Sequence, residues 1–285
     1  MNEFICVVPY DEGLFGLLKG RKLVVRTSDV RDIPRITKLV QENELHCIDL
    51  ITDEELSEID FEDGWGRFPL AVTVNSPGNI TKLLYNIERL RECNIKIYFQ
   101  PDRSFNYTAV QIIASLGITA GIRITPDKPA DWDAANDLLH YAAYSQGSHA
   151  PVEPFDYVLT RYAPQEFTYM TTPFFENPLK YLHLNEKIET ALSERDIREG
   201  RFVAVGHEEL KGIATSDAYT EALNAWQRLF LENSACSFCP AWRVCQGIHR
   251  HACEHEPGCS RFFQDLNEAA DHHYARREET KVWQS

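Results

Sequence analysis

The stretch that decides the fold is "IKIYFQPDRSFNYTAVQIIASLGITAGIRI", from Ile95 to Ile124. It opens with a short apolar run, Ile95–Gln100, and closes with a second one, Ile118–Ile124. The residues between the two runs carry a helical pattern, and Gly117 fits the left-handed position that follows a helix end. A strand–helix–strand unit of this length joins two parallel strands by a right-handed crossover.

The same unit recurs along the first two thirds of the chain. Apolar, β-branched runs also begin at Lys22, His46 and Pro69, and successive starts up to Ile118 lie 23 to 26 residues apart. Short, continuous apolar strands suit a sheet that is buried on both faces. We therefore predict an α/β fold with a parallel sheet, either a partial (β/α) barrel or an open sheet, because periodicity alone does not separate these two.

A stretch rich in aromatic residues and proline, His149–Pro178, has no strong periodicity and is predicted to be a linker that wraps the first domain. The aromatic side chains expected to hold this linker in place by burial are Phe155, Tyr157, Tyr162, Phe174 and Phe175. We place a domain boundary near residue 190, which divides the chain into domains 1–190 and 191–285.

Composition limits the classes of partner. The 285 residues carry a formal net charge of −14, which argues against nucleic acid because phosphate contacts need a basic surface. An acidic surface attracts cationic peptides or proteins. Apolar stretches stay well short of the ~18 residues of a membrane span, and the start "MNEFICVVPY" lacks the pattern of a secretory signal. A cytoplasmic location is expected, and clustered cysteines then indicate metal ligands rather than disulfides.

Several familiar motifs are missing from the chain. We find no G-x-G-x-x-G after a strand, no phosphate-binding P-loop, no G-x-S-x-G and no H-E-x-x-H. Ligands of parallel α/β folds usually sit at the carboxyl ends of the strands. Cys6, Cys47 and Cys93 stand alone in the first domain, so a core role is predicted for each.

The remaining cysteines cluster in "CSFCPAWRVCQGIHRHACEHEPGC", residues 236–259. Their spacing is Cys236-x2-Cys239-x5-Cys245, followed by Cys253 and Cys259. A C-x-x-C pair lets two thiolates reach one metal centre from a tight turn, and thiolate is preferred by both zinc and iron–sulfur clusters. The sequence predicts a small hairpin over 201–217 and a helix capped by Ser216 before the cluster, and a helix capped by Ser260 after it.

The order of hairpin, helix and C-x2-C-x5-C-x-G resembles the SPASM domain, the C-terminal cluster domain of peptide-modifying radical SAM enzymes. Those enzymes carry a partial (β/α) barrel before it, to which the regular first domain is similar. The resemblance implies a small cysteine-rich SPASM-like domain that holds one 4Fe–4S cluster. The four ligands that the resemblance implies are Cys236, Cys239, Cys245 and Cys259, with Cys253 as competitor for the fourth place and zinc as the alternative metal.

Two departures from the family pattern shape the expected function. His249 stands at the position of a further family cysteine and only His207 is present near the expected hairpin, so the second auxiliary cluster of the family is not expected. The motif C-x3-C-x2-C is missing after the run that begins at Lys22, so S-adenosylmethionine is not expected as a cofactor.

The resemblance therefore implies a non-catalytic accessory iron–sulfur protein of a radical SAM peptide-maturation system. It would act by electron transfer, by binding the enzyme or its precursor peptide, or by both. No nucleic acid and no membrane is expected as a partner. A zinc-stapled protein-interaction module is one alternative. The other is an iron–sulfur enzyme whose C-terminal cluster keeps an open coordination site.

Overall fold

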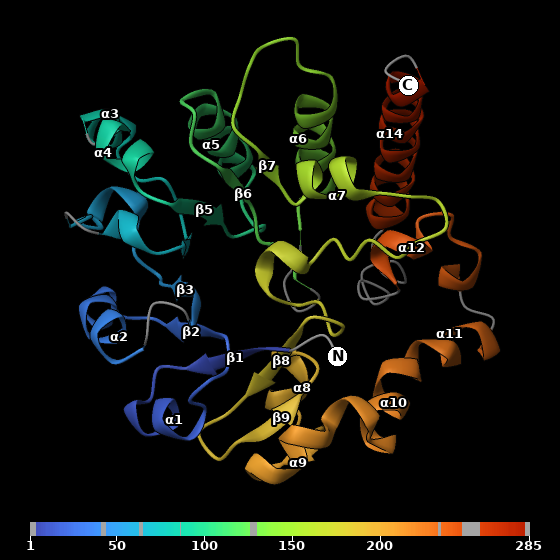
Figure 1. The fold of residues 1–285 in the computed structure, drawn as a ribbon. Helices are drawn as coiled ribbons and strands as arrows, with labels where there is room; N and C mark the ends of the chain where they lie inside the picture. Colours follow the sequence, from blue (N-terminus) through green and yellow to red (C-terminus); the bar gives the residue numbers. More distant parts are fainter. Residues whose placement is uncertain are drawn as a thin grey trace. The chain divides into compact units, whose positions relative to one another are not determined.

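The computed structural model describes residues 4–40, 44–62, 65–85, 87–125, 130–232, 235–246 and 257–282. It is a mixed α/β fold with a mostly parallel sheet (Figure 1). The chain divides into two compact units: unit 1 consists of residues 1–98 and 174–225, and unit 2 of residues 99–173 and 226–285. These units are defined by contacts and not by independent folding. The predicted domain boundary near residue 190 therefore stays a prediction.

Unit 1 is built around strands in the order β10-β9-β8-β1-β2-β3-β4-β5. Their bounds are β1 (Ile5–Pro9), β2 (Leu23–Thr27), β3 (Leu45–Ile51), β4 (Leu70–Val74), β5 (Ile95–Phe99), β8 (Tyr181–Leu184), β9 (Glu189–Ala191) and β10 (Ala204–Val205). The pairs β8–β1, β1–β2, β2–β3 and β3–β4 are parallel, whereas β8–β9 and β9–β10 are antiparallel. The strands predicted at Lys22, His46, Pro69 and Ile95 are confirmed, and β1 and β8 are additional.

The parallel strands are continuous apolar runs because both of their faces are covered. Val24, Val25, Ile48, Leu50 and Val72 are each 0% exposed, although neighbours in a strand point to opposite faces. The predicted pattern of a sheet buried on both sides is confirmed by these strands.

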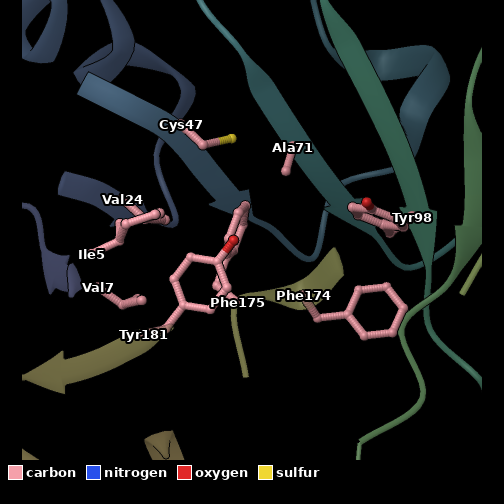
Figure 2. Packing of buried hydrophobic residues seen from close by; sticks show 9 residues of the cluster. All are labelled: Ile5, Val7, Val24, Cys47, Ala71, Tyr98, Phe174, Phe175 and Tyr181. Atoms are coloured by element: carbon pink, nitrogen blue, oxygen red, sulfur yellow. The ribbon is translucent and has the colours of Figure 1, made fainter. Parts of the chain in front are cut away.

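Aromatic residues from the expected linker complete the core of unit 1 (Figure 2). The Phe174 ring meets Tyr98 edge to face with 5.1 Å between centroids, and Phe175 meets Tyr181 in the same way at 5.5 Å. Phe155, Tyr162, Phe174 and Phe175 are buried as predicted, while Tyr157 is only half-buried. The end of the stretch is therefore part of the hydrophobic core.

The helices of unit 1 are short and mostly follow the strands. Their bounds are α1 (Glu12–Leu17), α2 (Ile33–Leu39), α3 (Ile80–Tyr85), α4 (Ile87–Glu92), α8 (Glu194–Arg198), α9 (Gly206–Gly212) and α10 (Asp217–Leu223). The prediction of Ser216 as an N-cap is confirmed, because its side chain accepts a hydrogen bond from the Tyr219 backbone N–H at 3.2 Å.

The hairpin predicted over 201–217 is wrong. The segment forms the two-residue strand β10 and then turns directly into α9. Gly206 has a φ of +80°, which ends the strand. The Glu209 carboxylate accepts a hydrogen bond from the Val205 N–H at 2.8 Å, and this contact at the helix start favours the helix over a second strand.

Unit 2 combines a short parallel strand pair with helices. Its elements are α5 (Ser104–Ser115), β6 (Ala120–Ile122), α6 (Trp132–Tyr144), β7 (Val152–Glu153), α7 (Phe155–Arg161), α11 (Gln227–Leu231), α12 (Trp242–Cys245) and α14 (Pro257–Val282). Gly117 after α5 has a φ of +85°, which confirms the predicted left-handed helix end. The strand and helix within 149–178, β7 and α7, correct the expectation of an irregular linker.

The long helix α14 packs on α6 and α7. Phe262 and Phe263 are each 1% exposed, and their ring centroids lie 5.2 and 5.8 Å from that of Trp132. The helix begins at Pro257, so the prediction of Ser260 as its cap is wrong. Proline suits the first turn of a helix because its missing N–H has no partner there. Among the described helices, none has the length and apolar character to cross a membrane.

Candidate functional site

The first half of the cysteine segment forms a tight turn in unit 2. Cys236 lies in a 3₁₀ turn, Ala235–Phe238, and Cys239 follows directly. The Cys239 N–H donates to the Cys236 carbonyl at 3.2 Å, and the Trp242 N–H donates to the Cys239 carbonyl at 3.1 Å. The first of these hydrogen bonds closes one turn of backbone and brings Cys236 and Cys239 close together.

The third cysteine, Cys245, is the last residue of α12 and is 8% exposed. Burial holds this short helix, because Ala241 is 0% and Val244 is 1% exposed. The backbone N–H groups of Thr168 and Met170 donate to the carbonyls of Arg243 and Val244 at 3.0 and 3.4 Å. A neighbouring loop of unit 2 therefore fixes the position of Cys245.

The structure describes the backbone of only one of the two candidates for the fourth ligand, Cys259. Cys253 lies outside the described residues, as does His249. Cys259 belongs to the first turn of α14, and its side chain is outside the described part. Among the described residues, His, Cys, Asp and Glu side chains form no group of three or more that would hold a metal ion. The thiols have the right chemistry for a soft metal, and the described ones do not by themselves make a complete site.

The solitary cysteines of the first domain behave as predicted in two of three cases. Cys6 is 0% and Cys47 is 6% exposed, so both belong to the core. Cys93 is only half-buried, and its predicted core role is wrong. It follows α4, where its N–H donates to the Leu90 carbonyl at 3.3 Å and ends the helix.

A cavity of 420 Å³ opens at the carboxyl ends of neighbouring parallel strands in unit 1. It lies where ligands of parallel α/β sheets usually bind. The strand ends that line it belong to β8, β1, β2 and β3, and α8 adds two residues. The lining residues are Val7, Val8, Pro9, Arg26, Thr27, Ser28, Ile51, His183, Leu184, Asn185, Glu186, Glu194 and Ile197.

Arg26 carries the central positive charge of this cavity. Its Nε donates to Oδ2 of Asp49 at 2.9 Å, and its Nη1 donates to Oε2 of Glu194 at 2.6 Å. The Asp49 side chain is 0% exposed and that of Arg26 is 16% exposed. A buried carboxylate needs such a partner, because an unpaired charge in this position is costly.

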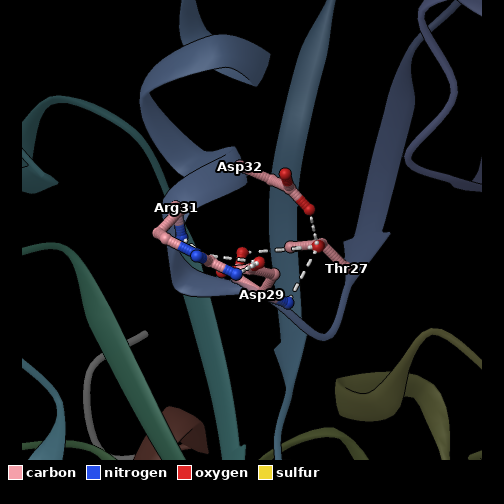
Figure 3. Close-up of polar contacts among 4 residues, drawn as sticks. All are labelled: Thr27, Asp29, Arg31 and Asp32. Carbon is pink, nitrogen blue, oxygen red and sulfur yellow. Dashed lines mark hydrogen bonds and ion pairs between the residues drawn. The ribbon is translucent and has the colours of Figure 1, made fainter.

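The loop after β2 is held by a compact set of polar contacts (Figure 3). The Thr27 hydroxyl donates to Asp32 Oδ2 at 2.5 Å and accepts from the Asp29 N–H at 3.1 Å. The Arg31 guanidinium binds the Asp29 carboxylate through Nε and Nη2, and these hydrogen bonds lower the pKa of Asp29 to about 2. These contacts define the shape of one wall of the cavity.

No known sequence motif predicts this cavity, but two charged residues in the sequence indicate it. Arg26 and Asp49 are charged residues inside the apolar runs "KLVVRT" and "HCIDLI". Opposite charges in neighbouring strands of a buried sheet indicate a buried ion pair.

No family model, no curated protein and no solved structure matches this chain. The resemblance to the SPASM domain therefore rests on the spacing of the cysteines.

Proposed function

We propose that this protein is a non-catalytic accessory iron–sulfur protein. The first part of its fold would be a partial (β/α) barrel-like domain, and its tail a SPASM-like domain that holds one 4Fe–4S cluster. The cluster ligands would be Cys236, Cys239, Cys245 and either Cys259 or Cys253. The observation that supports the proposal is the tight turn closed by the hydrogen bond from the Cys239 N–H to the Cys236 carbonyl at 3.2 Å.

The expected role follows from the number of thiolates. Four cysteine ligands saturate the four irons of a cluster and leave no iron open to substrate. Such a cluster supports electron transfer or a local structure rather than bond-making chemistry. The two buried cysteines, Cys236 and Cys245, are each 8% exposed, and burial tunes the potential of a cluster.

The proposed partner is a radical SAM enzyme, its precursor peptide, or both, in the cytoplasm. A net charge of −14 favours a cationic peptide segment or protein surface. S-adenosylmethionine is not part of the proposal, because the chain has no C-x3-C-x2-C motif.

The test is the metal content of protein purified without oxygen. We expect about four irons and four sulfides per chain, and loss of most of the iron in Cys236→Ser. Replacing Cys253 and Cys259 by Ser separately identifies the fourth ligand, because only one of the two variants should lose iron. Cys93→Ser is the matched control and should keep full occupancy.

Two results would overturn the proposal. One zinc per chain with no iron would favour the zinc-stapled interaction module instead. Full iron occupancy in both Cys253→Ser and Cys259→Ser would favour a cluster with an open iron, and therefore the enzyme alternative.

A further inference from the structure

The cavity of unit 1 has the dimensions and walls of a small-ligand site. Its volume of 420 Å³ falls in the range of about 300–1,000 Å³ that is usual for such sites. Six of its lining residues are apolar: Val7, Val8, Pro9, Ile51, Leu184 and Ile197. These walls call for an apolar body in the ligand, of the size of one or two amino-acid residues.

The charges around the cavity favour a cation over an anion. Glu186 and Glu194 line it together with Arg26 and with His183, whose ring lies 3.5 Å from the Glu176 carboxylate. The guanidinium of Arg26 already meets two carboxylates, those of Asp49 and Glu194. An anionic ligand would therefore approach a site with excess negative charge, whereas a protonated amine would find the exposed Glu186 carboxylate and could share Glu194 with Arg26.

Arg26 also carries an enclosed hydrogen-bond donor that lacks a protein acceptor. Its Nε and Nη1 are used by Asp49 and Glu194, but Nη2 is buried and has no hydrogen-bond partner. A buried donor without an acceptor costs about 1–3 kcal/mol. The Arg26 side chain is 16% exposed, so a small turn of the guanidinium toward the cavity would let a ligand carbonyl oxygen accept from this nitrogen and remove that cost.

Both polar rims of the cavity are ordered before a ligand arrives. The loop that follows Thr27 is closed by the contacts shown in Figure 3. On the other rim, Asn185 Oδ1 accepts from the N–H groups of Lys187 and Glu189, each at 3.0 Å. This turn carries Glu186 at an exposed position beside the cavity. A preorganised rim lowers the entropy that binding must overcome.

We propose that this cavity binds the free amino terminus of a peptide that begins with an apolar residue. The first side chain lies against the apolar walls, its carbonyl oxygen accepts from Arg26 Nη2, and its ammonium group lies by Glu186 and Glu194. The remainder of the peptide leaves through the open side of the cavity. This proposal goes beyond the iron–sulfur proposal and uses only residues of unit 1.

The test titrates the full-length protein with leucine amide at pH 6, followed by calorimetry and by ¹⁵N–¹H spectra. Three analogues each change one of the inferred contacts. N-acetyl-leucine amide removes the positive charge, isopentylamine removes the carbonyl, and free leucine adds a carboxylate. We expect each analogue to bind at least roughly tenfold more weakly than leucine amide. In the spectra, we expect the largest chemical-shift changes at residues 26–28 and 183–186.

Variants of the rim separate the charge contact from the fold. Glu186 lies at an exposed position. We expect Glu186→Gln to weaken the binding of leucine amide roughly fivefold and to leave the binding of N-acetyl-leucine amide unchanged. Glu208→Gln, on the exposed face of α9 and outside the cavity, should leave both affinities as they are. The double variant Cys236→Ser/Cys239→Ser should bind leucine amide as the native protein does, so loss of iron and loss of amine binding are distinguishable.

Three results would overturn the inference. They are equal binding of the acetylated and free amides, tighter binding of free leucine than of its amide, and an absence of shifts at the cavity residues at millimolar leucine amide.

Discussion

Replacing Asp49 by Asn removes one partner of the buried ion pair that positions Arg26 on the cavity. The Asp49 side chain is 0% exposed and accepts the Arg26 Nε–H at 2.9 Å. Removing one partner of a buried pair typically costs 3–5 kcal/mol. Because Glu194 still neutralises Arg26 at 2.6 Å, we expect the lower end, a loss of about 3 kcal/mol in the free energy of unfolding.

The assay is urea unfolding of the full chain, followed by the total fluorescence of its five tryptophans, among them Trp65, which is 5% exposed in unit 1. With a urea dependence of ~3 kcal/mol per molar, a loss of 3 kcal/mol lowers the midpoint by about 1 M. Glu194→Gln is the matched control. Its carboxylate is 45% exposed, so its loss should cost no more than about 1 kcal/mol and move the midpoint by at most ~0.3 M.

The double variant Arg26→Met/Asp49→Leu tests the physical reason. It removes both charges together, and apolar replacement of a buried pair is usually neutral or stabilising. We expect its midpoint to lie within about 0.3 M of the native protein. The reasoning is refuted if the double variant is as unstable as Asp49→Asn, or if Asp49→Asn and Glu194→Gln shift the midpoint equally.

Three further predictions concern packing, backbone contact and pH. Phe174→Ala should cost about 3–5 kcal/mol, because the ring is fully buried and packs on a second aromatic ring; urea midpoints measure this cost. Gly121→Ala should also be strongly destabilising by the same measure, because its new Cβ would lie 2.1 Å from the Glu153 carbonyl oxygen. Burial raises the pKa of Asp156 above its ordinary value of 3.8. The stability that accompanies its neutral form is present below pH 3.8 and is lost as the pH rises through the raised folded pKa. As the pH rises through this range, the urea midpoint of Asp156→Asn should therefore increase relative to that of the native protein. Urea unfolding of both proteins at several pH values measures this difference.

Each of these predictions has a result that would contradict it. A Phe174→Ala midpoint no lower than that of Tyr85→Ala, whose native ring is 86% exposed, would mean that the ring is not part of the core. Gly16→Ala is the control for Gly121→Ala, since its Cβ meets nothing within 4 Å in a helix and should be neutral or stabilising. A difference between Asp156→Asn and the native protein that stays constant with pH would show that burial does not penalise this carboxylate.

Much of the parallel sheet was predictable because buried strands leave a clear mark. The runs at Lys22, His46, Pro69 and Ile95 are short and mostly apolar, and helical patterns lie between most of the runs. The strands β1 and β8 could not be predicted in this way because each lies outside the series of regular repeats. Phe174 and Phe175 were correctly predicted to be buried, since large aromatic residues rarely stay in water.

The candidate sites divide in the same way. The spacing of Cys236, Cys239 and Cys245 is local information, so the sequence alone indicates a soft-metal segment, and the assembly of a complete ligand set stays a prediction. The cavity depends on which strand ends become neighbours. Arg26 and Glu194 are 168 residues apart in the chain and only 2.6 Å apart between their charged atoms.

The sequence by itself determined the fold class, the periodic strands and the chemical character of the cysteine segment, because each of these is written in spacings of a few residues. Only the tertiary structure decided that β8 lies beside β1, that Phe174 packs on Tyr98 and Phe175 on Tyr181, and that Arg26 is shared between Asp49 and Glu194. Such contacts join distant parts of the chain. They are selected by the packing and charge pairing of the whole unit, which no local pattern encodes.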